Sequence, residues 1–557
     1  MKRHVISLIL AVLPVLANAA VKVNGIYYKY NTTTKQATVV ESPDYYDRYS
    51  GDIVIPETVT IQKNVYTVSS IGECAFYESH LTSVSIPNSV SYIGAEAFSR
   101  TDLTSITIPD GVTVIEDKML YECDNLVSVS IPESVTSICE KAFGYCYRLS
   151  SIVIPKNVKI IKKGAFEGCK GLKTVNIPES TTSIGDEAFY ECSNLTSVTM
   201  PNSLISIGNY AFTSTNVNSI NIPDKVTTIG DVAFGICKNL TSVTIPNSVT
   251  SLGGSAFIGC GLTSLNIGSG LSSILGNTFA YCTQLTSVTI PDNVELIRGG
   301  AFQGCENLKT VKLGNGLKTI ENKAFDDCPN LTAITLPKSV TGIDKETFDC
   351  CGLTSIVVEE GNTTFDSRDN CNAFIRTSSN KLIEGCKNST IPEGVITIGE
   401  NAFFECYPLQ SITLSNSVET IEAGAFGHCE NMSSITFGSG LKEIIGYAFW
   451  GCTLMKQINC LATTPPTCND DAFWTINPET CVLTVPSGSK EAYQNARGWK
   501  VFKHIVEADM TGISATKSER QAEANVYGLN GQRLNHEQKG LNIIRKNDGT
   551  AKKVMKR

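Results

Sequence analysis

The sequence predicts a β-rich solenoid with minor helical content (α+β minor), built from about 16–17 coils, each of about 22–23 residues, and closed by a cap at each end. Three observations predict it. A short sequence repeat recurs along most of the 557 residues, apolar and polar residues alternate within each repeat, and non-repeating segments lie on both sides of the array. Repetition at such a period is typical of architectures in which each unit packs only on its neighbours.

A phenylalanine that usually follows an alanine marks each repeat. Most intervals equal the one from Phe143 to Phe166, and several are one residue shorter, as from Phe76 to Phe98. The missing residue is lost between the phenylalanine and the next leucine, which predicts a loop there. A period near 23 excludes ankyrin and tetratricopeptide units, which need about 33 and 34 residues. The marking residues are Phe76, Phe98, Leu120, Phe143, Phe166, Phe189, Phe212, Phe234, Phe257, Phe279, Phe302, Phe325, Phe348, Phe403, Phe426, Phe449 and Phe473.

Each repeat opens with a segment that predicts a β-strand. In "LTSVTIPNSVTSLGGSAFIGC", from Leu240 to Cys260, the pattern L-x-x-V-x-I alternates and is rich in Thr and Val. Pro246 ends the strand because proline has no N–H for the ladder. The period and this strand pattern fit the coil of a leucine-rich repeat. Stacking such coils at about 4.8 Å buries their apolar residues, so the phenylalanines form a spine in which each ring is worth about 3–5 kcal/mol.

The repeated text resembles one family closely. The units "LTSVSIPNSVSYIGAEAFSR" and "LTSVTIPDNVELIRGGAFQGC" are similar to the BspA-type leucine-rich repeats of bacterial surface proteins, over residues 66–458. Residues 20–65 resemble the β-hairpin cap that opens such arrays, and residues 459–508 resemble the cap that closes them. Caps are required physically, because a bare solenoid end exposes core and strand edges. The resemblance implies a surface protein that attaches to host matrix proteins or to other bacteria.

One insertion interrupts the array. The interval from Phe348 to Phe403 is more than twice the usual one, and it holds one repeat plus an extra segment. This segment, residues 359–390, is predicted to form an inserted hairpin with its turn at Ser378–Asn380. A tolerated loop and a functional insertion both remain open, and similar insertions in the family suggest a structural module.

Cysteine recurs at one position of the repeat, and the chain holds 21 in all. A zinc array would need paired ligands at C-x2-4-C spacing. Disulfides between coils are disfavoured, because in-register Cβ atoms about 4.8 Å apart exceed the usual 3.5–4.5 Å. We therefore predict a ladder of buried, inert thiols. Outside it, Cys371 with Cys386 and Cys468 with Cys481 are better disulfide candidates. The ladder comprises Cys123, Cys146, Cys169, Cys192, Cys237, Cys260, Cys282, Cys305, Cys328, Cys351, Cys406, Cys429 and Cys452.

The N-terminus is predicted to be a signal peptide, residues 1–19. Lys2 and Arg3 precede an apolar run, and Ala17-Asn18-Ala19 supplies a small-x-small cleavage pattern. The run is shorter than the roughly 20 residues that span a bilayer, and no later segment is longer, so the mature chain is expected to lack a transmembrane segment. The expected location is secreted or on the outer surface of a bacterial cell.

Residues 509–557 lose the repeat. "VYGLNGQRL" predicts two strands joined at Asn530-Gly531, a pair that suits a type I′ hairpin turn. This β tail resembles, although it is shorter than, the C-terminal sorting segments of exported Bacteroidota proteins that are read by the type IX secretion route. A frayed basic tail is the alternative.

The sequence gives no sign of catalysis. Its five histidines form no H-E-x-x-H motif, and there is no G-x-S-x-G elbow, phosphate loop or dinucleotide fingerprint. We expect no enzyme activity, no cofactor and no metal. A formal net charge of -8 with 18 % charged residues gives no reason to expect nucleic acid as a partner.

Two surfaces are candidates for binding. The strand-lined face is built mostly of Thr and Ser, such as Thr241, Ser242 and Thr244, which either wet the sheet or bind a glycan or multivalent protein partner. The second surface is an edge of aromatic residues just after the spine, where other repeats hold Gly, Glu, Asp or Ser. Its rings either form a binding hot spot or pack over the neighbouring coil. The tyrosines proposed to bind are Tyr77, Tyr121, Tyr145, Tyr147, Tyr190 and Tyr281.

The function predicted from the sequence is a secreted or cell-surface binding or adhesion protein. Its partner is an extracellular protein or glycan, to which it presents an extended solenoid surface. A structural spacer of the surface layer and a glycan-capture protein are the alternatives, because a fold does not fix a function.

Overall fold

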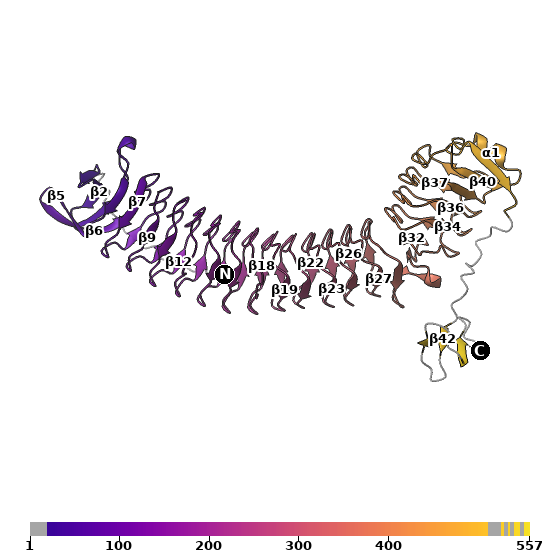
Figure 1. Cartoon of the computed structure of the whole chain (residues 1–557), viewed down its shortest axis with the longest axis horizontal. Helices are drawn as coiled ribbons and strands as arrows, with labels where there is room; N and C mark the ends of the chain where they lie inside the picture. Colours follow the sequence, from indigo (N-terminus) through magenta and orange to yellow (C-terminus); the bar gives the residue numbers. More distant parts are fainter. Residues whose placement is uncertain (1–18, 511–524, 528–532, 535–539, 546–550, 557) are drawn as a thin grey trace, which may run out of the picture. The chain divides into compact units, whose positions relative to one another are not determined.

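The computed structural model describes residues 19–510, 525–527, 533–534, 540–545 and 551–556 (Figure 1). Contacts divide the chain into a first unit, up to Ser378 with Glu384–Lys387, and a second unit, Ser379–Ile383 with the chain from Asn388 on. The described residues form many short strands and a single α-helix, α1 (Lys490–Asn495). The predicted β-rich solenoid is confirmed. The predicted signal peptide and most of the predicted tail lie outside the described residues.

The first unit opens with a small sheet that covers the end of the array. Strands β1, β2 and β3 form an antiparallel meander, β5 and β6 form a hairpin, and β3 pairs in parallel with β6. The sheet then passes into the coils, because β6 pairs with β8 of the next coil. The bounds are β1 (Val21–Val23), β2 (Ile26–Asn31), β3 (Gln36–Val39), the 3-10 helix η1 (Tyr45–Asp47), β4 (Ser50–Val54), β5 (Thr58–Ile61), β6 (Asn64–Ile71), β7 (His80–Ser85) and β8 (Tyr92–Ile93).

The first strand of a coil is the one that the sequence predicts. It pairs in parallel and in register with the same strand of the next coil, as Val243 does with Leu265. In the repeat from Leu240, the strand ends at Ile245, directly before Pro246. The strands of this set in the first unit are β9 (Ser105–Thr107), β11 (Ser128–Ser130), β14 (Thr174–Asn176), β16 (Ser197–Thr199), β19 (Ser242–Ile245), β21 (Ser264–Ile267), β23 (Ser287–Thr289), β25 (Thr310–Lys312), β27 (Ala333–Leu336) and β29 (Ser355–Val358).

Most coils carry a second, very short strand, which the sequence analysis did not predict. These strands build parallel sheets of their own, for example Ile184 beside Ile207 and Ile207 beside Ile229. They are β10 (Val114–Ile115), β12 (Ser137–Ile138), β13 (Ile160–Ile161), β15 (Ser183–Ile184), β17 (Ser206–Ile207), β18 (Thr228–Ile229), β20 (Ser251–Leu252), β22 (Ser273–Ile274), β24 (Leu296–Ile297), β26 (Thr319–Ile320) and β28 (Gly342–Ile343).

The spine phenylalanine lies in a turn that contains two residues with a left-handed backbone conformation. The first precedes the phenylalanine by two positions, and the second follows it by two positions. Around Phe212 these are Tyr210 (φ 55°) and Ser214 (φ 59°). A non-glycine residue in this region costs of order 1 kcal/mol or more. Hydrogen bonds between coils offset the cost, because the Phe166 N–H donates to the Ala188 carbonyl at 2.8 Å and equivalent bonds recur along the array.

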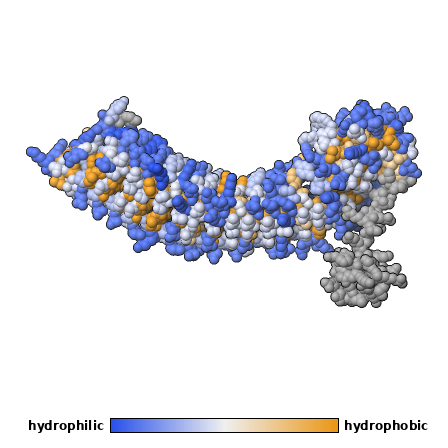
Figure 2. Space-filling view, viewed as in Figure 1, coloured by the Kyte–Doolittle hydropathy of each residue, from blue (hydrophilic) through white to orange (hydrophobic). Residues whose placement is uncertain are grey.

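The phenylalanine rings stack face to face along the core. In the first unit, ring centroids of consecutive stacked pairs are 5.2–5.7 Å apart. Phe166 and Phe189 are fully buried, 5.3 Å apart and inclined by 8°. Hydrophilic residues cover most of the visible surface of these coils, and apolar residues show only in small patches (Figure 2). The buried rings therefore follow one another along the core, and at Leu120 a fully buried leucine takes the place of the ring.

The predicted insertion contains the boundary between the units. Strands β30 (Phe365–Asp366) and β31 (Phe374–Arg376) pair antiparallel in the first unit, and the 3-10 helix η2 (Arg368–Asn370) lies between them. Strand β32 (Lys381–Glu384) spans the boundary, and its residues Lys381 and Leu382, which belong to the second unit, pair with β33 (Thr397–Ile398).

Two carboxylates are buried where the first unit ends. Asp349, directly after Phe348, is 6 % exposed, and Glu384 is 8 % exposed. Burial, followed by the charge of Asp349, raises the pKa of Glu384 well above its ordinary value. Glu384 is therefore held in its protonated form over a wider pH range than an exposed glutamate.

The second unit repeats the coil plan and ends in a cap. Trp499 is fully buried and donates from Nε1 to the Pro466 carbonyl at 2.8 Å, and the Tyr493 hydroxyl donates to the Ala462 carbonyl at 2.7 Å. The strands are β34 (Ser411–Thr413), β35 (Thr420–Ile421), β36 (Ser434–Phe437), β37 (Glu443–Ile444), β38 (Gln457–Cys460), β39 (Thr467–Cys468), β40 (Val482–Pro486) and β41 (His504–Ala508). Four further strands form an antiparallel sheet: β42 (Asn525–Tyr527), β43 (Arg533–Leu534), β44 (Gly540–Arg545) and β45 (Ala551–Lys556).

Candidate functional site

The proposed tyrosines lie in the turn after the spine, and the structure brings three of them together. The rings of Tyr121 and Tyr145 are 5.7 Å apart and perpendicular, and those of Tyr145 and Tyr147 are 6.1 Å apart. We call these three residues the tyrosine cluster. The other proposed tyrosines, Tyr77 and Tyr281, belong to distant coils, and Tyr190 is half-buried.

A buried ion pair fixes the centre of the tyrosine cluster. The Tyr145 hydroxyl donates to Glu167, whose other carboxylate oxygen is 3.1 Å from Lys141 Nζ. Glu167 is only 6 % exposed. The hydrogen bond to Glu167 and burial raise the pKa of Tyr145, and burial raises the pKa of Tyr121 to about 12. Both phenols therefore stay neutral hydrogen-bond donors throughout the physiological range.

Three tyrosine rings at this edge lie over a glycine of the following coil. A Cβ added to Gly168 would lie 2.5 Å from Cδ1 of Tyr145, and one added to Gly304 would lie 2.5 Å from Cδ1 of Tyr281. Tyr121 has the same relation to Gly144, at 3.1 Å. In all three cases the glycine follows the tyrosine by one full repeat, so the equivalent position of the next coil makes room for the ring.

We predict that Gly168→Ala destabilises the protein by about 1–3 kcal/mol, because the new methyl group meets the Tyr145 ring and alanine must adopt a φ of +68°. Chemical denaturation of the variant measures the loss. In a Tyr145→Ala background the same substitution should cost less, since the ring is gone. An equal cost in both backgrounds would show that the ring does not press on this glycine.

Two of the proposed tyrosines lie beside cations. Arg100 lies over the Tyr77 ring at 6.0 Å and pairs with Glu78 and Glu122 at 2.8 Å. Lys170 Nζ is 5.4 Å from the centre of the Tyr147 ring. Tyr147 and Tyr281 remain the most exposed of the six, at 41 % and 50 %. The edge therefore combines covering contacts with accessible aromatic surface.

The strand face has a different chemistry. Three positions of each first-strand segment point outward, as Thr241, Ser242 and Thr244 do. Over the thirteen coils that open between Leu81 and Leu353, these positions hold no aspartate or glutamate, although the chain has 54 acidic residues. Their only charges are Lys173, Lys309 and Lys312. The face is a long strip, mostly of hydroxyl and amide groups with a few exposed valines such as Val153, and it presents no carboxylate of its own.

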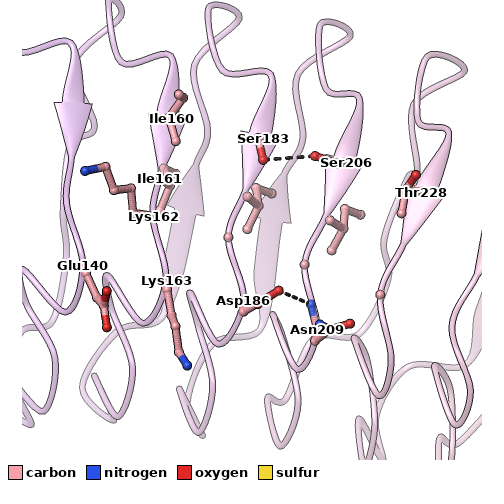
Figure 3. Close-up of a pocket in the computed structure, with 15 residues that line it drawn as sticks. Glu140, Ile160, Ile161, Lys162, Lys163, Ser183, Asp186, Ser206, Asn209 and Thr228 are labelled. Carbon is pink, nitrogen blue, oxygen red and sulfur yellow. Dashed lines mark hydrogen bonds between the residues drawn. The ribbon is translucent and has the colours of Figure 1, made fainter.

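A shallow hollow of about 520 Å³ lies over the second strands from β13 to β18 (Figure 3). Its polar groups bond from coil to coil: the Ser206 hydroxyl donates to Ser183 at 3.0 Å, and the Asn209 N–H donates to Asp186 at 2.7 Å. The Asp231 N–H donates in turn to the Asn209 side chain at 2.7 Å. These side chains hold neighbouring coils in register and do not converge on one point.

The described residues contain no group of three or more His, Cys, Asp or Glu side chains placed to hold a metal ion. Two histidines of this part of the chain lie beside carboxylates, His80 at 3.0 Å from Asp102 and His428 at 3.9 Å from Glu430. No helix among the described residues is long and apolar enough to cross a bilayer.

The repeated cysteines are buried at the turn after the spine. Most of their thiols donate to the carbonyl of the spine residue of the preceding coil, as Cys192 does to Phe166 at 3.1 Å. Burial raises the pKa of Cys192, which leaves it a protonated thiol. The expected disulfides outside the ladder are absent, because Cys371, Cys468 and Cys481 are free thiols. Cys371 points its Sγ toward the Ala373 carbonyl, 3.8 Å away.

A solenoid with an L-x-x-V-x-I strand, a stacked phenylalanine and a buried thiol in most coils defines a leucine-rich-repeat protein. The model of the BspA type leucine rich repeat region (6 copies) matches residues 56–173, 159–286, 272–382 and 374–496, and the chain belongs to this family.

Solved structures of similar chains are also leucine-rich-repeat proteins. One from Bacteroides ovatus is 25 % identical over 79 % of this chain and 94 % of its own, with a TM-score of 0.47. A leucine rich cell surface protein from Faecalibacterium prausnitzii is 22 % identical over 90 % and 99 %, with a TM-score of 0.33. The pneumococcal vaccine antigen PcpA is 17 % identical over 88 % and 99 %, with a TM-score of 0.31. None of the curated protein sequences compared with the chain matches it.

Proposed function

We propose that this protein is a non-enzymatic adhesion or binding protein of the bacterial cell surface or its surroundings. One observation carries the proposal: the tyrosine cluster offers exposed aromatic area on rings that are already fixed in place. Tyr145 is held by Glu167 from one side and by the backbone at Gly168 from below. Rings immobilised before binding lose little conformational entropy when a partner arrives, and tyrosine is enriched in binding hot spots.

The location follows from the family and from the expected export signal. Repeat proteins of the BspA type and the cell-surface neighbour support an extracellular or surface location. Residues 1–19 would direct export, and residues 509–557 would serve as a sorting tail in a member of the Bacteroidota. A protein of the host matrix or of another cell is the proposed partner.

An array of matrix proteins and glycans, probed with the purified protein, tests the proposal. Replacing Tyr121, Tyr145 and Tyr147, the three residues of the tyrosine cluster, together by serine should weaken the interaction by about 30-fold or more, as hot-spot losses of about 2 kcal/mol do. Tyr210→Ser is the matched control, because Tyr210 is 41 % exposed but lies before its spine phenylalanine. Unchanged binding by the triple variant would exclude this edge as the contact.

Capture of glycans is a second candidate function, favoured by the hydroxyl-rich strand face. Replacing outward hydroxyl residues such as Ser242 and Thr244 by alanine should then weaken binding to polysaccharide and leave binding to matrix proteins intact. A structural spacer would show no saturable ligand with either class.

A further inference from the structure

The second unit carries a row of exposed aromatic side chains on its own turn edge. Tyr447 is 46 % exposed, Trp450 is 42 % exposed and Trp474 is 68 % exposed. The rings of Tyr447 and Trp474 are 6.1 Å apart, and Trp450 contacts His428 edge-on at 4.4 Å. We call Tyr447, Trp450 and Trp474 the tryptophan edge.

The packing of the coils does not account for these three rings. Nearby, Phe404 covers Gly427 and His428 covers Gly451, with an added Cβ 2.8 Å and 2.9 Å from the ring atoms. By contrast, the position of the next coil that is equivalent to Trp450 holds Trp474 itself. The position of the next coil that is equivalent to Tyr447 holds Asp471. No glycine makes room beneath the tryptophan edge, so Trp450 meets the neighbouring coil edge-on at His428, Tyr447 meets the inclined ring of Trp474, and a large part of each ring stays exposed.

The charges along this edge exclude an anionic partner. Residues 401–407, 424–431, 446–454 and 470–477, which build the turn, contain four carboxylates and no lysine or arginine. Arg497 reaches Asp470 at 2.9 Å and neutralises that one carboxylate. Polyanions such as acidic glycans or nucleic acid would meet unfavourable charge here.

The arrangement of the rings also argues against a single cation. Tyr447 and Trp450 come from one coil and Trp474 from the next, and Tyr447 is inclined to Trp474 by 42°, so the three rings do not close an aromatic cage around one point. Exposed indole and phenol rings, in turns that also carry carboxylates, match the two kinds of group on a neutral sugar chain. The apolar C–H faces of pyranose rings stack on indole and phenol, and sugar hydroxyls donate to carboxylates.

We propose that the tryptophan edge is a binding site for a neutral polysaccharide, with Tyr447, Trp450 and Trp474 as stacking platforms. Tyr447 has a left-handed backbone (φ 59°) inside the tight turn, and its ring leans against Trp474, which limits its freedom before the ligand arrives. The site lies wholly in the second unit and goes beyond the proposed function, which concerns the tyrosine cluster of the first unit.

The three tryptophans of the chain make the test direct. Trp499 is fully buried, so only Trp450 and Trp474 are open to a quencher such as acrylamide. Titration of the full chain with neutral polysaccharides (a mannan, a xylan and a mixed-linkage β-glucan) should shield these two tryptophans from quenching. Trp474→Ala and Trp450→Ala should each weaken binding about tenfold in affinity electrophoresis, as loss of an aromatic contact does, and the double variant should abolish it.

The control is the triple tyrosine variant of the first unit, which should keep full affinity for the polysaccharide even if its other partner is lost. The two proposals can therefore fail separately. The inference is overturned if none of the neutral polysaccharides shields the tryptophans, if Trp474→Ala binds as tightly as the parent protein, or if an oligoarginine peptide or an acidic polysaccharide is the ligand that shields them.

Discussion

Replacing Phe166 with alanine is expected to lower the free energy of unfolding by about 3–5 kcal/mol. The ring is fully buried and stacks on Phe143 at 5.2 Å and on Phe189 at 5.3 Å, so its loss opens a cavity with an aromatic face on each side. Hydrogen exchange is the measurement of choice, because a repeat protein can open in part. Amide protection should fall in the coils next to Phe166 and stay unchanged in β1–β3 at the end of the array.

Phe166→Leu is the matched control for this prediction. The spine already holds a leucine at Leu120, which is fully buried between Phe98 and Phe143 in the sequence of coils. A change that nearly conserves apolar volume should cost less than about 1.5 kcal/mol. Equal losses in the two variants would mean that the ring's stacking, and not the volume it fills, dominates the stability of the spine.

Glu384→Gln is expected to stabilise the protein at neutral pH and to change little at acid pH. The pKa of Glu384 is raised by burial and by Asp349, so the folded protein binds a proton that the unfolded chain releases above its ordinary pKa of about 4.5. Stability is therefore lost as the pH rises through the window above that value. The loss is about 1.4 kcal/mol for each unit by which the folded pKa exceeds the unfolded one.

Glutamine removes this penalty because it cannot ionise. Denaturation curves at several pH values should show parent and variant converging near pH 4 and separating as the pH rises. Asp349→Asn is the companion variant, since it removes the like charge and should lower the pKa of Glu384 while burial remains. A constant difference between Glu384→Gln and the parent at every pH would contradict the assignment.

The strand pattern, the spine and the thiol positions could be predicted because they recur. A spine position that returns at one spacing in coil after coil outweighs any local ambiguity, and L-x-x-V-x-I has the alternation of a strand. The second strand was missed because a segment as short as Ser251–Leu252 cannot show a period. Its existence depends on register with neighbouring coils, which local sequence does not contain.

The aromatic edge shows where a better signal existed. In three pairs a tyrosine precedes a glycine by one full repeat: Tyr145 and Gly168, Tyr281 and Gly304, and Tyr121 and Gly144. This spacing could have predicted that each of these rings covers the following coil. The expected disulfides were misjudged because nearness along the chain says nothing about thiol direction. The sequence pattern singled out neither Asp349 nor Glu384, because their burial depends on the return of Glu384–Lys387 to the first unit.

The relay of side-chain acceptors from Asp186 to Asn209 to Asp231 has a consequence for how such proteins change in length. In this stretch each coil carries the acceptor that a backbone N–H of the following coil requires, so a coil duplicated here in frame meets the same hydrogen bond at its new junction. The array can thus gain length in unit steps by recombination where neighbouring coils carry matching side chains, whereas a junction such as Tyr145 over Gly168 fixes the order of its two coils.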